Sequence, residues 1–252
     1  MDATVLDAGE GERLDTEHRI KLASPQLDVV EFTVGPDYKG PGPHYHERHV
    51  DAFYVLVGEL EFRTGPDTLR AGPGTSVAVP PGVVHSFTNP GPHGAHFINV
   101  HAPGGFAEYL RARIAGDEPD PVDFDIHDVN GPVGNGSAIV ATAEGGERFQ
   151  PPNLAITIRA DRPELSLLEL APDAGWSGVD PHHHDDHVDS FFVLAGEVDF
   201  LTGDEWVRAY AGSFVSMPIG VTHAIGRAVA PARFLNLHAP DAGFAGRVRV
   251  RS

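Results

Sequence analysis

Residues 43–59 read PHYHERHVDAFYVLVGE, and residues 181–197 repeat this pattern as PHHHDDHVDSFFVLAGE, 138 residues later. The same offset relates residues 74–89, GTSVAVPPGVVHSFTN, to residues 212–227, GSFVSMPIGVTHAIGR. After a gap of one residue, FINVHAP at residues 97–103 returns as FLNLHAP at residues 234–240. The chain is therefore predicted to consist of two similar domains related by internal duplication.

The repeat divides the chain into three predicted segments. We expect an N-terminal domain over residues 1–112 and a C-terminal domain over residues 138–252. The stretch between them, residues 113–137, is rich in Asp, Pro and Gly and is predicted to be a linker. Each domain is large enough to bury a core of its own.

The residue pattern within each copy favours strands. Short runs of β-branched and aromatic residues are separated by turn residues every 8–12 positions, roughly the spacing of strands in sandwiches and barrels, which predicts an all-β fold. Residues 53–57 and 191–195 are apolar on both faces, as in a strand that is buried on both sides. A helix is expected only over residues 105–113, where apolar residues have helical spacing.

The composition limits the possible partners and ligands. The chain has 252 residues, a formal net charge of −18 and no Cys. The lack of Cys excludes disulfides and thiolate metal sites, and the negative charge disfavours nucleic acid and anionic membrane surfaces. No secretory signal or membrane-length apolar run is present, so a cytoplasmic protein is expected. The 15 His residues, in contrast, favour metal binding, because imidazole is a common metal ligand.

The histidines of the repeat have the spacing of metal ligands. Residues two apart on a strand face the same side, so the two outer His of each HxH sequence are expected to project together. A carboxylate follows in the next strand, and a third His follows a Pro-x-Gly bend. Three imidazoles and one carboxylate suit Fe, Mn, Ni, Co or Zn as divalent ions. The candidate ligands are His44, His46, Asp51 and His85 in the first copy, and His182, His184, Asp189 and His223 in the second.

These segments resemble the two sequence motifs of the cupin family. Residues 44–58 and 182–196 resemble the first motif, and residues 74–89 and 212–227 resemble the second. Two departures stand out. Asp51 and Asp189 occupy the position where the family normally has Glu, and Arg227 replaces the Asn that ends the second motif.

The resemblance implies a bicupin, in which two tandem jelly-roll barrels each hold one metal, up to two per chain, among the four candidate residues. Because Asp is one methylene shorter than Glu, a site completed by His49 or His187 is the alternative ligand set. His101 and His238 share a strand face with Asn neighbours, and we expect them to form structural hydrogen bonds. A barrel without metal, in which the histidines only fill the core, is the competing interpretation.

Apolar residues in phase with the ligands are expected either to line a substrate pocket or to pack the core. They are Phe53, Val55 and Phe87 in the first copy, and Phe191, Val193 and Ile225 in the second.

The resemblance is to bicupins of the quercetin 2,3-dioxygenase type. It implies a metal-dependent dioxygenase that acts on a small chelating substrate such as an enol, catechol or flavonol, with Asp51 or Asp189 as the catalytic base. The alternatives are an isomerase or decarboxylase that uses the metal as a Lewis acid, and a non-catalytic cupin that binds a small molecule or a metal. We expect a small-molecule substrate and either a monomer or a homodimer.

Overall fold

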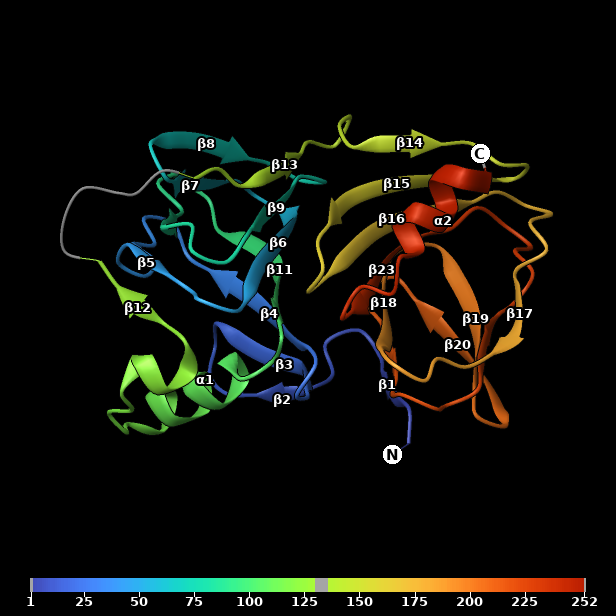
Figure 1. Cartoon of the computed structure of the whole chain (residues 1–252), viewed down its shortest axis with the longest axis horizontal. Helices are drawn as coiled ribbons and strands as arrows, with labels where there is room; N and C mark the ends of the chain where they lie inside the picture. The colour runs from blue at the N-terminus through green and yellow to red at the C-terminus, as the bar shows by residue number, and fades with distance from the viewer. Residues whose placement is uncertain (1, 130–135, 252) are drawn as a thin grey trace. The chain divides into compact units, whose positions relative to one another are not determined.

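The computed structural model describes residues 2–129 and 136–251, and Figure 1 shows the course of the chain. The chain folds into two units. Residues from Glu12 to Gly145 form the first domain, and residues from Gly146 onwards, together with those up to Gly11, form the second. Both domains consist mainly of strands, which confirms the predicted all-β fold with two similar domains.

The first domain contains a seven-stranded and a five-stranded antiparallel sheet. The large sheet has the order β13-β9-β6-β11-β4-β3-β2, and the small sheet has the order β12-β5-β10-β7-β8. The elements are β2 (Glu12–Arg13), β3 (His18–Ala23), β4 (Asp28–Val34), β5 (His44–Tyr45), β6 (Val50–Val57), β7 (Leu60–Thr64), β8 (Asp67–Ala71), β9 (Ser76–Val79), β10 (His85–Thr88), β11 (Ala95–Ala102), α1 (Phe106–Ala115), η1 (Pro121–Phe124), β12 (His127–Asp128) and β13 (Ile139–Ala141).

The second domain repeats this plan with a seven-stranded and a four-stranded sheet. Their orders are β1-β21-β18-β23-β16-β15-β14 and β17-β22-β19-β20. The elements are β1 (Thr4–Leu6), β14 (Glu147–Phe149), β15 (Leu154–Asp161), β16 (Ser166–Pro172), β17 (Val179–His182), β18 (Val188–Ala195), β19 (Glu197–Thr202), β20 (Glu205–Tyr210), β21 (Phe214–Met217), β22 (His223–Ile225), β23 (Arg233–Ala239) and α2 (Phe244–Arg251). Among the described residues, no helix has the length and apolarity needed to cross a bilayer.

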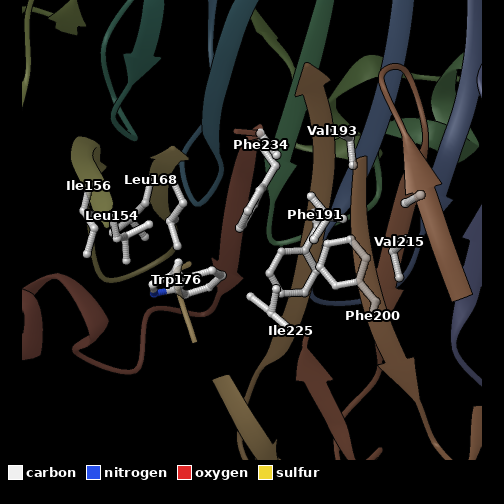
Figure 2. Packing of buried hydrophobic residues seen from close by; sticks show 14 of the residues in the cluster. Leu154, Ile156, Leu168, Trp176, Phe191, Val193, Phe200, Val215, Ile225 and Phe234 are labelled. Carbon is white, nitrogen blue, oxygen red and sulfur yellow. The ribbon is translucent and has the colours of Figure 1, made fainter. Parts of the chain in front are cut away.

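Aromatic side chains hold the two sheets of each domain face to face. In the first domain, the buried ring of Phe53 on β6 lies 4.9 Å from that of Phe62 on β7, measured between centroids. In the second domain, the equivalent rings of Phe191 on β18 and Phe200 on β19 are 4.7 Å apart and pack beside Phe234, as Figure 2 shows. Each pair joins the large sheet to the small one, so these contacts close the core between the sheets.

The central strands of the large sheets are buried on both faces. The first six residues of β6 and of β18 are all buried, which agrees with the apolar character of both faces in the sequence. Successive side chains of a strand point to opposite faces of the sheet, so both faces of these strands are buried.

Each large sheet is completed by a strand from outside the repeated region. β1 pairs with β21, with Val5 opposite Val215, and β13 pairs with β9, with Val140 opposite Val77. Residues 113–129, which fall in the predicted linker, supply the end of α1 together with η1 and β12 to the first domain. The structure therefore divides the chain after Gly11 and after Gly145, whereas the sequence repeat suggested divisions at residues 112 and 138.

Helix α1 occupies the region where a short helix was expected, and a buried carboxylate fixes its start. Asp28 accepts hydrogen bonds from the backbone N–H groups of Gly105 and Ala107, both at 2.8 Å, and from that of Ser24 at 3.1 Å. Free N–H groups at a helix start favour a carboxylate. The helix ends at Gly116, whose φ of 92° is left-handed and suits glycine.

We expect replacement of Asp28 by Ala to lower the free energy of unfolding by about 2–3 kcal/mol, because buried backbone donors lose their acceptor. Asp28→Asn keeps one acceptor oxygen and is expected to lose less. Denaturant unfolding monitored by circular dichroism measures the difference, with the exposed Asp173 changed to Ala as the control. Equal stability of all three variants would show that this carboxylate does not anchor the helix.

Candidate metal centres

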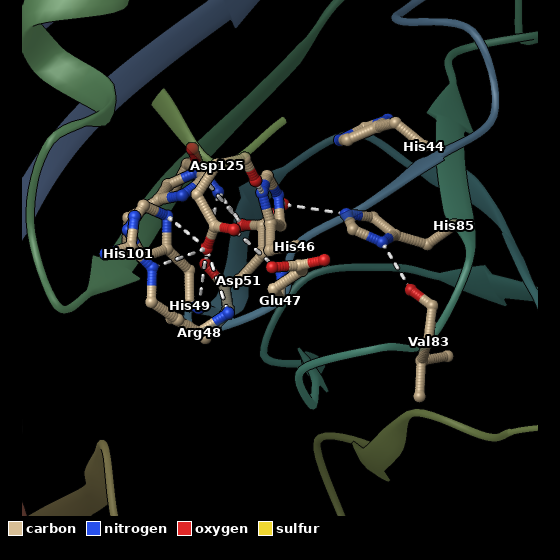
Figure 3. A network of polar contacts seen from close by, with 12 residues as sticks. His44, His46, Glu47, Arg48, His49, Asp51, Val83, His85, His101 and Asp125 are labelled. Carbon is tan, nitrogen blue, oxygen red and sulfur yellow. Dashed lines mark hydrogen bonds and ion pairs between the residues drawn. The ribbon is translucent and has the colours of Figure 1, made fainter. Parts of the chain in front are cut away.

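Three strands of the first domain bring the four predicted ligands together. His44 and His46 come from β5 and the turn that follows it, His85 begins β10 and pairs with His44, and Asp51 lies on β6. The potential ligand atoms of these four residues all lie within 4.8 Å of one another, and all four side chains are buried. Figure 3 shows the group. Asp51 Oδ2 is 3.0 Å from His85 Nε2, so the shorter Asp reaches the imidazoles.

A glycine bend sets the position of His85. The chain turns at Gly82, whose φ of 77° is left-handed, and the Gly82 N–H donates to the carbonyl oxygen of His46 at 2.7 Å. In the second domain, Gly220 has a φ of 81° and donates to the carbonyl of His184 at 2.8 Å. The Pro-x-Gly sequence therefore ties the third histidine of each centre to the second.

Backbone carbonyls fix the orientation of the three imidazoles. His44 Nδ1 donates to the carbonyl of Gly42 at 2.9 Å, and His85 Nδ1 donates to the carbonyl of Val83 at 3.0 Å. His46 Nδ1 donates to the carbonyl of Asp125 at 2.7 Å. Because a carbonyl only accepts, each Nδ1 carries a proton, so in the neutral form of each ring Nε2 is the unprotonated nitrogen.

This arrangement fits a bound cation. His85 Nε2 and Asp51 Oδ2 are 3.0 Å apart and are both acceptors when the imidazole is neutral, so they attract each other only across a proton or a metal ion. His46 Nε2 is buried and has no hydrogen-bond partner among the described residues. A divalent metal satisfies all of these atoms at once, with the outer nitrogen of each His bonded to the backbone as is usual for metal ligands.

The ionisation of the centre also suits a metal. Burial, assisted by the neighbouring His85, lowers the pKa of His44 to about 3, so this ring is neutral near pH 7. Although burial opposes it, the imidazoles of His101, His46 and His85 hold the pKa of Asp51 well below its usual range. A neutral imidazole and an ionised carboxylate are the forms that bind metal.

Strand β11 holds the carboxylate in place. Asn99 Nδ2 donates to Asp51 Oδ1 at 2.6 Å, and His101 Nε2 lies 3.3 Å from the same oxygen. Asp51 Oδ2 is thereby left to face the imidazoles. Asn99 and His101 were expected to form structural hydrogen bonds, and the residue that they contact is the candidate ligand Asp51.

Asp125 belongs to this centre although no sequence motif pointed to it. Its carboxylate accepts from the backbone N–H groups of Glu47 and Arg48 at 2.9 Å and from that of His49 at 3.2 Å, while its carbonyl accepts from His46. Asp125 has a φ of 60° and follows η1, inside the predicted linker. It lies 79 residues from His46, so no local pattern could connect the two.

The second domain assembles its four candidate ligands in the same way. His182, His184, Asp189 and His223 place their ligand atoms within 4.8 Å of one another. Asp189 Oδ2 is 3.2 Å from His223 Nε2 and 3.6 Å from His184 Nε2, and Asn236 Nδ2 donates to Asp189 Oδ1. This centre is more open, because the His184 side chain is 17% exposed whereas that of His46 is 2% exposed.

The alternative ligands His49 and His187 lie beside the four-residue centres and outside them. His49 groups with His46 and Asp125, and His187 groups with His184 and His238. Both rings are buried. Each is therefore a neighbour of the centre and contacts it through the second histidine of the HxH sequence.

A cavity opens onto each centre, and a helix forms one wall. In the first domain, a cavity of about 470 Å³ reaches His44 and Asp51 and is lined on one side by Phe106, Tyr109 and Arg113 of α1. In the second domain, a cavity of about 410 Å³ reaches His182 and His184 and is lined by Phe244, Arg247 and Val248 of α2.

Of the two roles expected for the apolar residues in phase with the ligands, core packing predominates. Of the six, Phe87 lines the first cavity. All six pack within the hydrophobic cores, so Phe87 has both roles and the other five have the core role. The residues concerned are Phe53, Val55, Phe191, Val193 and Ile225.

The sequence of both domains matches a known family. Residues 30–101 and residues 166–238 each match the profile of the cupin domain. The chain belongs to the cupin family. With two such domains it is a bicupin, and the resemblance noted in the sequence is confirmed.

One curated relative of this cupin is quercetin 2,3-dioxygenase from Bacillus subtilis (strain 168), which is 34% identical over 113 residues. The match covers 42% of this chain and 33% of the relative, so the chain spans one third of that protein's length.

Solved structures of Bacillus subtilis oxalate decarboxylase share the fold of this cupin. A mutant of that enzyme has a TM-score of 0.68 at 16% identity, and the match covers 96% of this chain and 78% of the other. The structure determined at pH 4.6 has a TM-score of 0.66 at 15% identity, with coverage of 96% and 77%.

We expect His46→Ala to lower the metal content of purified, untagged protein by about one equivalent per chain, since His46 belongs to the two candidate groups of the first domain that contain more than one His. Plasma mass spectrometry after dialysis measures the content. His93→Ala, at an exposed position, is the matched control and should leave the content unchanged. Equal metal content in all three proteins would argue against a metal in the first domain.

Proposed function

We propose that this bicupin is a metal-dependent dioxygenase that acts on a small chelating substrate of the enol, catechol or flavonol type. The observation that carries the proposal is the opening of each cavity onto a group of three imidazoles and one carboxylate. The relative named quercetin 2,3-dioxygenase supports the same reaction class. Cavities of this size suit a small organic molecule.

The four residues of each centre would hold the metal, whose identity among Fe, Mn, Ni, Co and Zn is open. When bound, the metal supplies charge that lowers the pKa of a coordinated hydroxyl group and open positions for substrate and O₂. In the first centre, the ligands are His44, His46, Asp51 and His85. In the second, they are His182, His184, Asp189 and His223.

Asp51 is the proposed base of the first centre. It lines the cavity, it is ionised, and Asn99 holds one of its oxygens while the other faces the ligand nitrogens. A carboxylate of low pKa is a sufficient base for a hydroxyl group whose own pKa the metal has lowered. Asp189, bonded to Asn236 in the same manner, has the corresponding role in the second centre.

Helix α1 supplies the substrate contacts. Phe106 and Tyr109 present aromatic surface to the cavity and suit a flat aromatic ring. Arg113, one turn farther along, places a positive charge at the cavity wall of a strongly acidic protein. This charge favours the deprotonated form of a chelating substrate.

In a protein whose second centre is disabled by Asp189→Asn, Asp51→Asn is expected to lower kcat with a flavonol or catechol substrate by about 100- to 10,000-fold, because the amide cannot accept the proton. Oxygen consumption measures the rate, and metal content is measured on the same sample so that loss of the base is separated from loss of the metal. Unchanged activity in a metal-loaded Asp51→Asn protein would transfer the role of base to His49. The exposed Asp173, changed to Asn, is the control.

A second candidate reaction is decarboxylation of a small carboxylate with the metal as Lewis acid, and Arg247 favours it. This residue lines the second cavity beside His182 and His184, with its guanidinium carbon 5.8 Å from the centroid of the Phe244 ring. A guanidinium suits the recognition of a carboxylate. Turnover under strict anaerobiosis with release of CO₂ would favour decarboxylation and would exclude the dioxygenase.

A further inference from the structure

Three histidines form a second cluster next to the metal centre of the second domain. The nitrogen atoms of His184, His187 and His238 that face one another lie within 4.8 Å. His187 precedes β18 and is 2% exposed, and His238 on β23 is 1% exposed. The ring of Phe244 stacks on His238 at 4.7 Å between centroids and covers the cluster. The proposed reaction uses neither His187 nor His238.

Hydrogen bonds fix which nitrogen of His187 is protonated. His187 Nδ1 is 2.6 Å from Asp186 Oδ1. A carboxylate accepts, so Nδ1 donates the hydrogen. The neutral ring then has an unprotonated Nε2, which is buried without a hydrogen-bond partner among the described residues.

The tautomer of His238 follows from Asn236. The Asn236 amide nitrogen donates to Asp189 Oδ1 and to the carbonyl of Ser190, so its other atom, Oδ1, is an acceptor. His238 Nε2 lies 2.9 Å from this Oδ1 and must therefore donate. His238 Nδ1 is left unprotonated.

The cluster thus presents nitrogen atoms that need a cation. His184 Nε2, His187 Nε2 and His238 Nδ1 are all buried without a hydrogen-bond partner in the described part of the chain. Lone pairs that converge without donors are unfavourable in a dry interior. Three neutral imidazoles are instead a ligand set for a divalent ion such as Zn, Cu or Ni.

We propose that His184, His187 and His238 form a second metal position that overlaps the four-residue centre. His184 belongs to both sets, and its buried Nε2 is the nitrogen that we assign to each. Because this atom has one lone pair, the second domain holds one metal ion in either of two positions. In the four-residue position Asp189 is a ligand. In the three-histidine position Asp189 is not a ligand, and its carboxylate is free to act as a base. The proposal does not depend on which reaction the protein catalyses.

Among the described residues of the first domain, His46, His49 and His101 do not form a matching set. His101, the counterpart of His238, turns its Nε2 to Asp51 Oδ1 at 3.3 Å. His49, the counterpart of His187, groups with the Asp125 carboxylate, which already accepts three backbone N–H bonds. The two positions are therefore specific to the second domain.

Zinc binding by variants in a His46→Ala background tests the proposal. Each of these variants also carries His127→Ala, so that all three candidate groups of the first domain are broken. Adding His223→Ala breaks the four-residue set, and about one zinc per chain should still bind through the three histidines. A further His187→Ala change should abolish binding. The matched control is His183→Ala, which alters an exposed neighbouring histidine and should leave binding intact.

Removing the shared residue gives the sharpest result. His46→Ala/His184→Ala should bind no zinc, whereas His46→Ala/His187→Ala should keep about one equivalent in the four-residue set. Competition with a chromogenic chelator measures the affinity, and circular dichroism verifies folding.

If the His223 variant does not fold, His182→Ala breaks the same set. A folded His46→Ala/His223→Ala protein without zinc, or one that keeps zinc after His187→Ala, would overturn the proposal. Loss of zinc from the His46→Ala protein itself would instead count against both metal sets of the second domain.

Discussion

The burial of a carboxylate among imidazoles is the constraint on which each domain depends. Asp51 and Asp189 are fully withdrawn from solvent, and a charge in such a place needs partners on all sides. An Asn on the neighbouring strand binds one oxygen, and histidines face the other. The register of β11 and β23, the glycine bends and the carbonyls that bind Nδ1 all serve to place these partners.

The two domains use this common arrangement with different surroundings. In the first, Asp125 binds three successive N–H groups of the turn after His46 and encloses the centre. In the second, the corresponding turn carries Asp186, which binds His187 and leaves imidazole nitrogens unused. The first domain thus has the more closed site and the second domain the more open one. Duplicated sites that differ in this way can take different substrates.

The sequence was sufficient for the features that depend on local spacing. The repeat gave the two all-β domains, and the alternation of strand residues placed His44 beside His46. Features that depend on contacts between distant segments could not be predicted from the sequence. Asp125 lies in a stretch without periodicity. Of the two helices that wall the cavities, α1 was predicted and α2 was not. The apolar residues of β6 and β18 could either line a pocket or pack the core, and only the packing of the two sheets shows that they belong to the core.

Strands β1 and β13 each form one edge of a large sheet. Without them, β21 and β9 would be terminal strands with unpaired N–H and C=O groups and with buried residues at every position. Such an edge is a template for pairing with another molecule. Each short strand therefore protects its sheet from pairing with another molecule. A fragment that ends or begins at the limits of the sequence repeat would lack β13 or β1, and it would expose β9 or β21 as an unpaired edge strand.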